Sequence, residues 1–318
     1  MKTRINSPHV ISALLSRLLL LAALFISTIG SAHAGIIYTA HYGSNRIDKF
    51  DSVTGANLGV FASGLGGPVG LAFDGTGNLF VSGYSNGTIT KITSAGVAST
   101  FATGLDRPYY MAFDSTGNLF TANAGTGTSG SISKFTPGGA SSVFAASISG
   151  YVNGLAFDGS GNLYASRHAA NGSGGSILKY NSAGGSLGVF ASGFDYSQDI
   201  EFDVAGNLYV AQLNSDIMKV TPGGVVSSFS TVKATGIAFD STGNLFAAGF
   251  GGQLNRIPGS GGSGVLVTSL GGGGDTYGIA FAPVAATVPE PGTLALLAVS
   301  SGALAWTRRR RRAVILTQ

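Results

Sequence analysis

Two carboxylates, Asp199 and Glu201, are the residues whose types and spacing best suit chemistry. They lie at alternate positions of the segment 198–202, so in an extended strand both side chains project from one face. Crowded carboxylates can bind a cation, or one can act as a general base when its pKa is raised. The simpler interpretation, which the sequence favours, is that they pair with a cation such as Arg167 or Lys233, or reach solvent.

A turn motif, Asp-x-x-Gly-Asn followed by an apolar and an aromatic residue, recurs along the chain. It occupies residues 74–80, 114–120, 158–164, 203–209 and 240–246. Glycine adopts positive φ angles without strain, and the Asp carboxylate can accept hydrogen bonds from nearby N–H groups, so each motif predicts a hairpin turn. Each turn offers a single carboxylate, whereas calcium takes roughly six to eight oxygen ligands. We therefore expect these residues to cap turns.

The repeat has a regular period. A phenylalanine precedes each turn, and a sixth ends a similar strand without a turn; these anchors are Phe73, Phe113, Phe157, Phe202, Phe239 and Phe281. Successive anchors are 40, 44, 45, 37 and 42 residues apart. A period of about 40 residues with several strands per unit is typical of β-propeller blades.

Each unit contains four candidate strands, and the two ends of the repeat region complement each other. In the second full unit the strands are 109–113, 118–122, 131–135 and 141–145. Segments 36–40, 46–50 and 58–62 match strands two to four of a unit that lacks its first strand, and 277–281 is a first strand without followers. Pairing these ends removes two open sheet edges. We expect an all-β, six-bladed propeller of four antiparallel strands per blade, closed by its N- and C-terminal strands.

This fold gives the two carboxylates a place, because first strands line the axis of a propeller. Other units carry small residues at the positions of Asp199 and Glu201, except that the second unit has Tyr110 beside Ala112. The sequence therefore predicts two carboxylates in an axial channel.

A second candidate site is the face formed by loops that enter first strands and leave second strands. Its candidate ligand-binding residues are Asp106, Arg107, Tyr109, Tyr110, Tyr151, Asn153, Arg167, His168, Asp195, Tyr196, Gln198 and Tyr277. Aromatic rings mixed with amide and charged groups suit contacts to carbohydrate or peptide. The alternative is that the tyrosine rings only pack the loops.

The N-terminal residues 1–34 have the pattern of a secretory signal peptide. Cations precede an apolar run at 18–26, and Ala32-His33-Ala34 is a small-x-small cleavage pattern that would release a chain beginning at Gly35. The sequence thus predicts export. After cleavage only His41 and His168 remain of the histidines, and we expect both on surface loops.

The C-terminal part has three successive features after the expected propeller domain (35–283) and linker (284–287). They are the segment Val288-Pro289-Glu290-Pro291, an apolar stretch at 294–306, and the run Arg308, Arg309, Arg310, Arg311 and Arg312. The apolar stretch predicts a short transmembrane helix whose arginines, with the tail 313–318, stay in the cytoplasm.

Charge is concentrated at the two ends. Between Gly35 and Val288 there are ten Lys and Arg against thirteen Asp and Glu, so this body has a net charge near −3. A basic face for nucleic acid is therefore not expected. The chain has no cysteine, so no disulfide can lock the ring.

The repeats resemble the NHL-repeat group, whose blades run apolar strand, Asp-x-x-Gly-Asn, aromatic strand, polar loop, then Ile-x-Lys/Arg-aromatic. Segment 36–50, with Gly43-Ser-Asn-Arg-Ile47, is especially similar, and the related gluconolactonase and virginiamycin B lyase propellers share the architecture. Gluconolactonase-like propellers hold their metal with a Glu, an Asn and an Asp. The resemblance therefore implies Glu201, Asn153 and Asp199 as a candidate set for a divalent cation such as Ca²⁺.

The C-terminal region 288–312 is similar to PEP-CTERM sorting signals, which an exosortase recognises in proteins exported by Gram-negative bacteria. This resemblance implies the secretion machinery and an exosortase as partners, a transient stay in the inner membrane, and a final place at the cell surface or outside the cell. The alternative is a membrane anchor that is never processed.

Together these features predict a monomeric, non-catalytic binding or scaffold propeller without a cofactor, whose ligand is an exopolysaccharide or a surface protein. The alternative function is a metal-dependent hydrolase, lactonase or lyase with its site in the axial channel.

Overall fold

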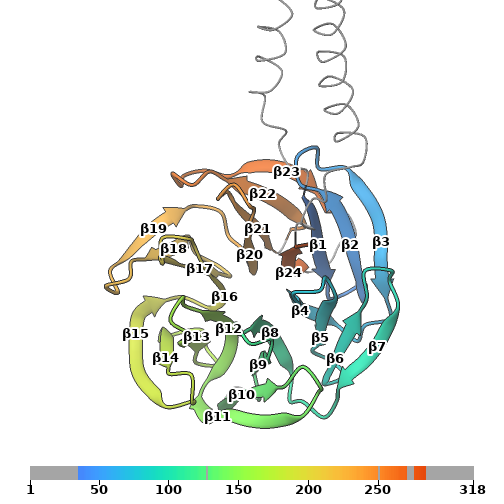
Figure 1. The fold of residues 1–318 in the computed structure, drawn as a ribbon. Helices are drawn as coiled ribbons and strands as arrows, with labels where there is room; N and C mark the ends of the chain where they lie inside the picture. The colour runs from blue at the N-terminus through green and yellow to red at the C-terminus, as the bar shows by residue number, and fades with distance from the viewer. Residues whose placement is uncertain (1–34, 127, 250, 271–275, 284–318) are drawn as a thin grey trace, which may run out of the picture. The chain divides into compact units, whose positions relative to one another are not determined.

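The structure is a computed structural model that describes residues 35–283 except 127, 250 and 271–275. This part of the chain forms six four-stranded antiparallel sheets arranged radially around an axis (Figure 1). The prediction of a six-bladed β-propeller is confirmed.

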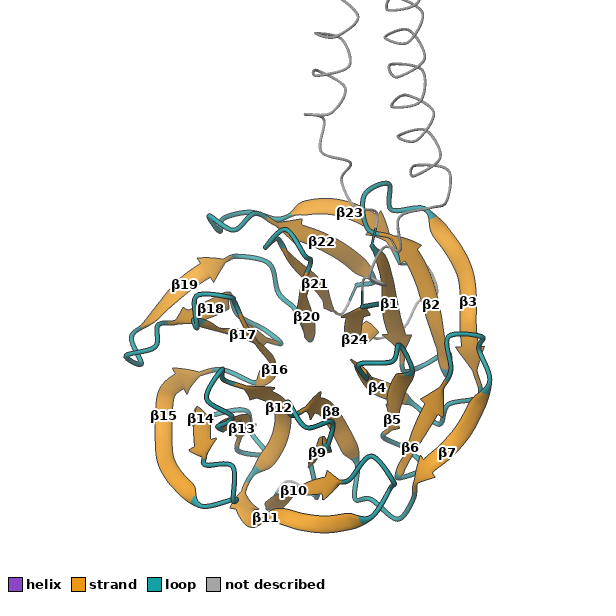
Figure 2. Ribbon diagram, viewed as in Figure 1, coloured by secondary structure: helices purple, strands orange, loops and turns teal. Residues whose placement is uncertain are grey.

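The first strand of each blade lies innermost and the fourth outermost (Figure 2). Blade 1 contains β4 (Pro68–Phe73), β5 (Leu79–Gly83), β6 (Thr88–Ile92) and β7 (Ala98–Ala102). Blade 2 contains β8 (Pro108–Phe113), β9 (Leu119–Asn123), β10 (Ser129–Phe135) and β11 (Ser141–Ser149). Blade 3 contains β12 (Tyr151–Phe157), β13 (Leu163–His168), β14 (Gly175–Tyr180) and β15 (Ser186–Phe194).

The second half of the ring repeats this order. Blade 4 contains β16 (Ser197–Phe202), β17 (Leu208–Gln212), β18 (Ile217–Val220) and β19 (Val226–Ser230). Blade 5 contains β20 (Gly236–Phe239), β21 (Leu245–Gly249), β22 (Gln253–Ile257) and β23 (Val265–Ser269). Blade 6 contains β24 (Thr276–Phe281), β1 (Ile36–His41), β2 (Arg46–Asp51) and β3 (Asn57–Ser63).

Blade 6 closes the ring as the sequence predicts. Strand β1 pairs antiparallel with β24, with Ile37 opposite Phe281 and Tyr38 opposite Ala280. The two ends of the propeller thus supply one sheet, and the edges that each would expose alone are paired. All six sheets and this closing contact lie between residues 35 and 283.

Strand boundaries in blade 2 differ from the expected ones by one to four residues. The largest difference is β11, which continues to Ser149 because β-bulges let it follow β10 as far as the pair Ser129 and Ser149. A bulge adds a residue on one strand, a feature that hydrophobic alternation does not reveal.

Aromatic rings join each blade to the next. The aromatic residue of each second strand meets the phenylalanine anchor of the following first strand edge-on, with ring centroids 5.0–5.2 Å apart. The six pairs are Tyr38–Phe73, Phe80–Phe113, Phe120–Phe157, Tyr164–Phe202, Tyr209–Phe239 and Phe246–Phe281. Edge-to-face pairs add about 0.5–1.5 kcal/mol beyond the burial of their area. The phenylalanine before each Asp-x-x-Gly-Asn turn thus packs against the preceding blade and links two blades.

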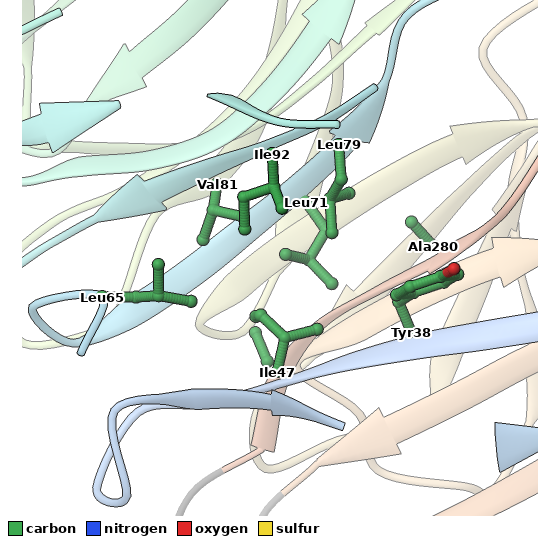
Figure 3. Close-up of a cluster of buried hydrophobic side chains, with 9 residues drawn as sticks. Tyr38, Ile47, Leu65, Leu71, Leu79, Val81, Ile92 and Ala280 are labelled. Carbon is green, nitrogen blue, oxygen red and sulfur yellow. The ribbon is translucent and has the colours of Figure 1, made fainter. Parts of the chain in front are cut away.

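Aliphatic side chains fill the space between these rings. Figure 3 shows the cluster between blades 6 and 1, where Tyr38, Ile47 and Ala280 pack with Leu71, Leu79, Val81 and Ile92. Since this cluster crosses the closing blade, burial of apolar area there holds the ring shut without a disulfide.

The repeated turns are capped as expected. In the turn of blade 2, Asp114 Oδ1 accepts hydrogen bonds from the Thr116 and Asn118 backbone N–H groups, each at 2.9 Å, and Oδ2 accepts one from Asn118 Nδ2 at 2.7 Å. Partial burial raises the Asp114 pKa, but these hydrogen bonds outweigh it and hold the pKa below its usual value. Both carboxylate oxygens are thus occupied by the turn itself.

The predicted signal peptide (1–34), linker (284–287), sorting and transmembrane segment (288–312) and tail (313–318) lie outside the described residues. The part of the chain that the structure describes contains no helix long and apolar enough to cross a membrane.

Candidate functional site

A cavity of about 480 Å³ lies on the axis and is lined by the C-terminal halves of all six first strands. Its walls include the six half-buried phenylalanine anchors and, one residue before them, Ala72, Ala112, Ala156, Ala238 and Ala280 in five blades. In blade 4 that position is Glu201. At this level of the cavity Glu201 is therefore the one carboxylate in a ring of alanines, as the sequence indicates.

Nearer the middle of the axis the first strands approach one another closely. At Gly154 an added Cβ would lie within 2.4 Å of the Gln198 carbonyl oxygen of the next blade, and Gly70, Gly236 and Gly278 have similar neighbours. The alternating small residues therefore have two roles. The glycines allow the backbones of neighbouring first strands to approach closely, and the alanines line the cavity. Only Tyr110 and Asp199 place side chains at the glycine level.

Asp199 is held by backbone groups of two blades. Its Oδ1 accepts a hydrogen bond from Ile200 N and its Oδ2 one from Ile237 N, both at 3.0 Å. Burial, at 8% exposure, raises the pKa of Asp199 well above its usual value, Glu201 raises it further, and the two N–H groups oppose the change. Asp199 thus links β16 to β20 as well as facing the cavity.

Glu201 has no such partners. Within the described residues its carboxyl makes no hydrogen bond or ion pair, and burial raises its pKa to about 7. Pairing with a cation, one of the two expected outcomes, is wrong: Arg167 donates to Ser176 Oγ and the Ser149 carbonyl oxygen, and Lys233 is exposed and does not line the cavity. The reason is register, since both cations lie at the other end of the axis from the C-terminal half of β16. The other expected outcome, contact with solvent, agrees with the partial exposure of Glu201.

Tyr110 crosses the axis. Its hydroxyl donates a hydrogen bond to the Thr235 carbonyl oxygen at 2.6 Å, which connects blade 2 to blade 5 on the opposite side of the ring. The side chain is 3% exposed. We expected Tyr110 to contact a ligand at the loop face, but its side chain is internal. We call it the Tyr110 crossbar, because it spans the axis between the cavity and the opposite end.

Beyond this crossbar, four tyrosine rings form a closed cycle of edge-to-face contacts that we call the tyrosine cap. Its members are Tyr42, Tyr84, Tyr109 and Tyr277, with successive centroids 5.7–6.0 Å apart. All four side chains are half-buried. Tyr109 also donates from its hydroxyl to Gln198 Oε1 at 3.0 Å. Burial, followed by the neighbouring Tyr277 and Tyr84, raises the Tyr109 pKa well above its usual value.

The cap brings together Tyr109 and Tyr277, which the sequence predicts as site residues, and Tyr42 and Tyr84, which sequence reasoning missed. A signal was present, because a tyrosine immediately follows the second strand in both blade 6 and blade 1. Arg107 borders the cap, with its guanidinium carbon 6.0 Å from the Tyr84 ring centroid, and Asp106 is exposed beside it.

Two of the predicted residues have unusual backbone conformations. Arg107 (φ 54°) and Tyr196 (φ 45°) precede the first strands of blades 2 and 4, and blade 1 has Gly67 (φ 71°) in the same place. For a residue with a Cβ the left-handed region costs about 1–2 kcal/mol, and such strain clusters at functional sites. Arg107 and Tyr196 therefore occupy positions of this face at which glycine would be less strained.

A separate group surrounds His168 at the same end of blades 3 and 4. The His168 ring lies 5.4 Å from both the Tyr151 and Tyr196 rings, its Nδ1 is 2.7 Å from the Ala169 carbonyl oxygen, and its Nε2 is 3.0 Å from Asn153 Nδ2. The carbonyl can only accept, so Nδ1 carries the proton and Nε2 accepts from the amide. Burial lowers the His168 pKa, so the ring is neutral near pH 7.

Asn153 is therefore not placed with the axial carboxylates. Its Nδ2 also donates to the Ser197 carbonyl oxygen at 3.1 Å, and it does not line the cavity. Of the set Glu201, Asn153 and Asp199, the structure brings only the two carboxylates together. Among the described residues no group of three His, Cys, Asp or Glu side chains could hold a metal ion.

Both histidines are buried rather than on the surface, at 2% exposure for His41 and 5% for His168. His41 Nε2 lies 3.4 Å from Asp48 Oδ2, which also accepts from Arg46. The expectation of surface histidines is wrong because each closes a second strand, where neighbouring strands cover it.

Comparisons with known proteins agree with this architecture. The PEP-CTERM protein-sorting motif matches residues 287–312. No curated protein matches the chain in sequence. Among solved structures, a chain of the nidogen/laminin complex superposes with a TM-score of 0.67 at 16% identity, over 78% of this chain and 98% of the other.

Structures of two enzymes also share the fold. A gluconolactonase from Xanthomonas campestris gives a TM-score of 0.55 at 16% identity, over 67% of this chain and 82% of the enzyme. A streptogramin B lyase gives 0.50 at 15% identity, over 72% and 73%. At these identities the likeness concerns the fold. The chain is a six-bladed β-propeller, and its PEP-CTERM motif indicates an exosortase-sorted extracellular protein.

Proposed function

We propose that this exported propeller is a non-catalytic binding protein that holds a polysaccharide against the tyrosine cap at the cell surface or in the extracellular matrix. The observation that carries the proposal is the closed cycle of four half-buried tyrosine rings at one end of the axis.

The cap offers what a sugar polymer needs. Sugar rings present flat C–H faces and hydroxyl edges, and tyrosine supplies a flat apolar ring with a polar tip. Because each ring contacts two others, the cap is held in one arrangement before a ligand arrives, which reduces the entropy lost on binding. Arg107 and Asp106 at its border add hydrogen-bonding groups.

The sorting motif supports the location of this activity. A chain sorted by an exosortase meets the polymers and proteins of the cell surface. The body between Gly35 and Val288 has a net charge near −3, which favours a neutral polymer over a polyanion.

The alternative, a metal-dependent hydrolase, lactonase or lyase, has one observation in its favour: Asp199 and Glu201 share the axial cavity. Its implied third ligand, Asn153, bonds His168 and Ser197 instead. Metal content of the purified protein and hydrolysis of gluconolactone test this alternative. Turnover that is lost in Glu201→Gln would replace the binding proposal with an enzymatic one.

The binding proposal is tested with the full-length protein in non-ionic detergent on a glycan array and, in parallel, on immobilised peptides. We expect saturable binding to neutral polysaccharides that Tyr84→Ala weakens by tenfold or more, which is about 1.4 kcal/mol. Val143→Ala, at an exposed position of the outer strand β11, serves as the control and should bind normally. Binding to peptides alone would show that the ligand is a protein, and equal binding by both variants would place the site elsewhere.

A further inference from the structure

The axial cavity is a second, chemically different site that the tyrosine cap does not explain. Its lining includes phenylalanine anchors from every blade, apolar side chains of the first strands, and three polar groups, Tyr110, Asp199 and Glu201. The Tyr110 crossbar lies between this cavity and the cap. A ligand in one is therefore separate from a ligand in the other.

The charges in this cavity are unbalanced. No Lys, Arg or His is among the residues that line it. Asp199 has both oxygens engaged by backbone N–H groups, but Glu201 has no partner in the described chain. Glu201 is half-buried, and a carboxylate held partly out of water without a cation is costly, so a cationic ligand would find a complementary group there.

The walls favour one kind of cation. A divalent metal ion needs roughly six oxygen ligands or more, and the cavity supplies one uncommitted carboxylate among apolar side chains. Organic ammonium groups are weakly hydrated by comparison, pack against apolar atoms, and are attracted to aromatic rings. The volume of about 480 Å³ lies within the range of small-molecule pockets.

We propose that the axial cavity binds a small organic ammonium compound, with Glu201 as its counter-ion and the phenylalanine anchors as its walls. The cation enters from the end that bears the Asp-x-x-Gly-Asn turns, where the anchors Phe73, Phe157 and Phe239 are partly exposed. The five alanines at the Glu201 position leave the room that the ligand occupies.

The test uses tetramethylammonium as the probe, with tert-butanol as a neutral compound of similar size. Isothermal titration of the full-length protein in non-ionic detergent should show saturable binding of tetramethylammonium and none of tert-butanol. Glu201→Gln should weaken the binding at least tenfold, and Asp106→Asn at the opposite end should leave it unchanged. The double variant Glu201→Ala, Ala156→Glu moves the carboxylate to the equivalent position of the preceding blade, blade 3, and should restore binding.

Tetramethylammonium has no titratable proton, so its pH dependence reports on the protein alone. The other titratable groups around Glu201 are Asp199 and Tyr110 in the cavity and Tyr209, which pairs with Glu201 across the strands. Since burial raises the pKa of Glu201 to about 7, binding should tighten about tenfold between pH 6 and pH 8. The pKa of Asp199 is raised as well, so loss of this pH dependence in Glu201→Gln is what assigns it to Glu201.

Three results would overturn the proposal: no saturable binding of tetramethylammonium, equal binding by Glu201→Gln, or Ca²⁺ binding that depends on Glu201 while the ammonium probe fails. The cavity variants leave Tyr84 and Tyr109 intact. Loss of polysaccharide binding in the cap variants is therefore a separate outcome from loss of ammonium binding here.

Discussion

The Tyr110 hydroxyl lies 2.6 Å from the Thr235 carbonyl oxygen, and this hydrogen bond joins residues 125 positions apart on opposite sides of the ring. Neighbouring blades of a propeller are joined by packing, but opposite blades meet only at the axis. The bond therefore braces the ring across its centre and also divides the axis into a cavity at one end and the tyrosine cap at the other.

Replacing Tyr110 by Phe should remove this brace and leave the ring in place. Thr235 O keeps a second donor, Asp199 N at 3.3 Å, so no orphaned acceptor results. We expect a loss of about 1 kcal/mol and a fall in Tm of about 2–4 °C. Differential scanning calorimetry measures this fall in Tm. The matched control is Tyr84→Phe, because the Tyr84 hydroxyl makes no hydrogen bond within the described residues. Equal Tm values for Tyr110→Phe and the parent would contradict the bracing role.

The ring-to-ring contacts between blades should dominate stability. Phe120 is buried, with its centroid 5.0 Å from both Phe144 and Phe157. Phe120→Ala should cost about 3–5 kcal/mol in the free energy of unfolding, because the cavity left behind spans two blades. Val143→Ala, 70% exposed on the outer strand, should change it by less than about 0.5 kcal/mol. Urea unfolding compares the two, and similar losses for both variants would show that the aromatic chain is not the main support.

Glu201 should make the propeller less stable as the pH rises. Its folded pKa of about 7 exceeds the ordinary value of 4.5, so the unfolded chain releases the proton first. The stabilising contribution is complete below pH 4.5 and is lost by about pH 7, a difference on the order of 3 kcal/mol. Glu201→Gln should match the parent at pH 4 and exceed it at pH 8 in urea unfolding. A constant difference at both pH values would mean that Glu201 is solvated.

The turn aspartates should affect the pH dependence of stability in the direction opposite to Glu201. Hydrogen bonds from Asn118 and Thr116 hold the folded pKa of Asp114 below that of the unfolded chain. Stability from this group is therefore present above the unfolded pKa and is lost as the pH falls through the lower folded value. Asp114→Asn should lower the Tm at pH 7, and variant and parent should converge below about pH 3. Asp106→Asn is the control. A difference that persists undiminished in acid would show that the carboxylate charge is not what stabilises the turn.

Features set by a motif or by the repeat could be predicted from the sequence, and contacts between blades could not. The Asp114–Asn118 turn follows from a motif, and the pairing of β1 with β24 follows from the repeat, although these strands come from opposite ends of the propeller. The contact between Tyr110 and Thr235 depends on the diameter of the ring. The burial of His41 beside Asp48 depends on the hairpin register of β1 and β2.

The candidate site was predicted in part for the same reason. Periodicity places Glu201 on the axis, since every other blade has alanine there. It does not reveal that the Asn153 amide bonds the Ser197 carbonyl oxygen, because this contact joins two different blades. The cap is assembled from three blades, so no single repeat contains its pattern.

Polysaccharide binding at the tyrosine cap is tested most directly by titration. The affinities of the full-length protein and of Tyr84→Ala for the same neutral polysaccharide are measured under identical conditions. We expect saturable binding by the parent and a dissociation constant at least tenfold higher for Tyr84→Ala, with Val143→Ala unchanged. A parent protein that binds no polysaccharide, or a Tyr84→Ala variant that binds as tightly as the parent, would contradict this expectation.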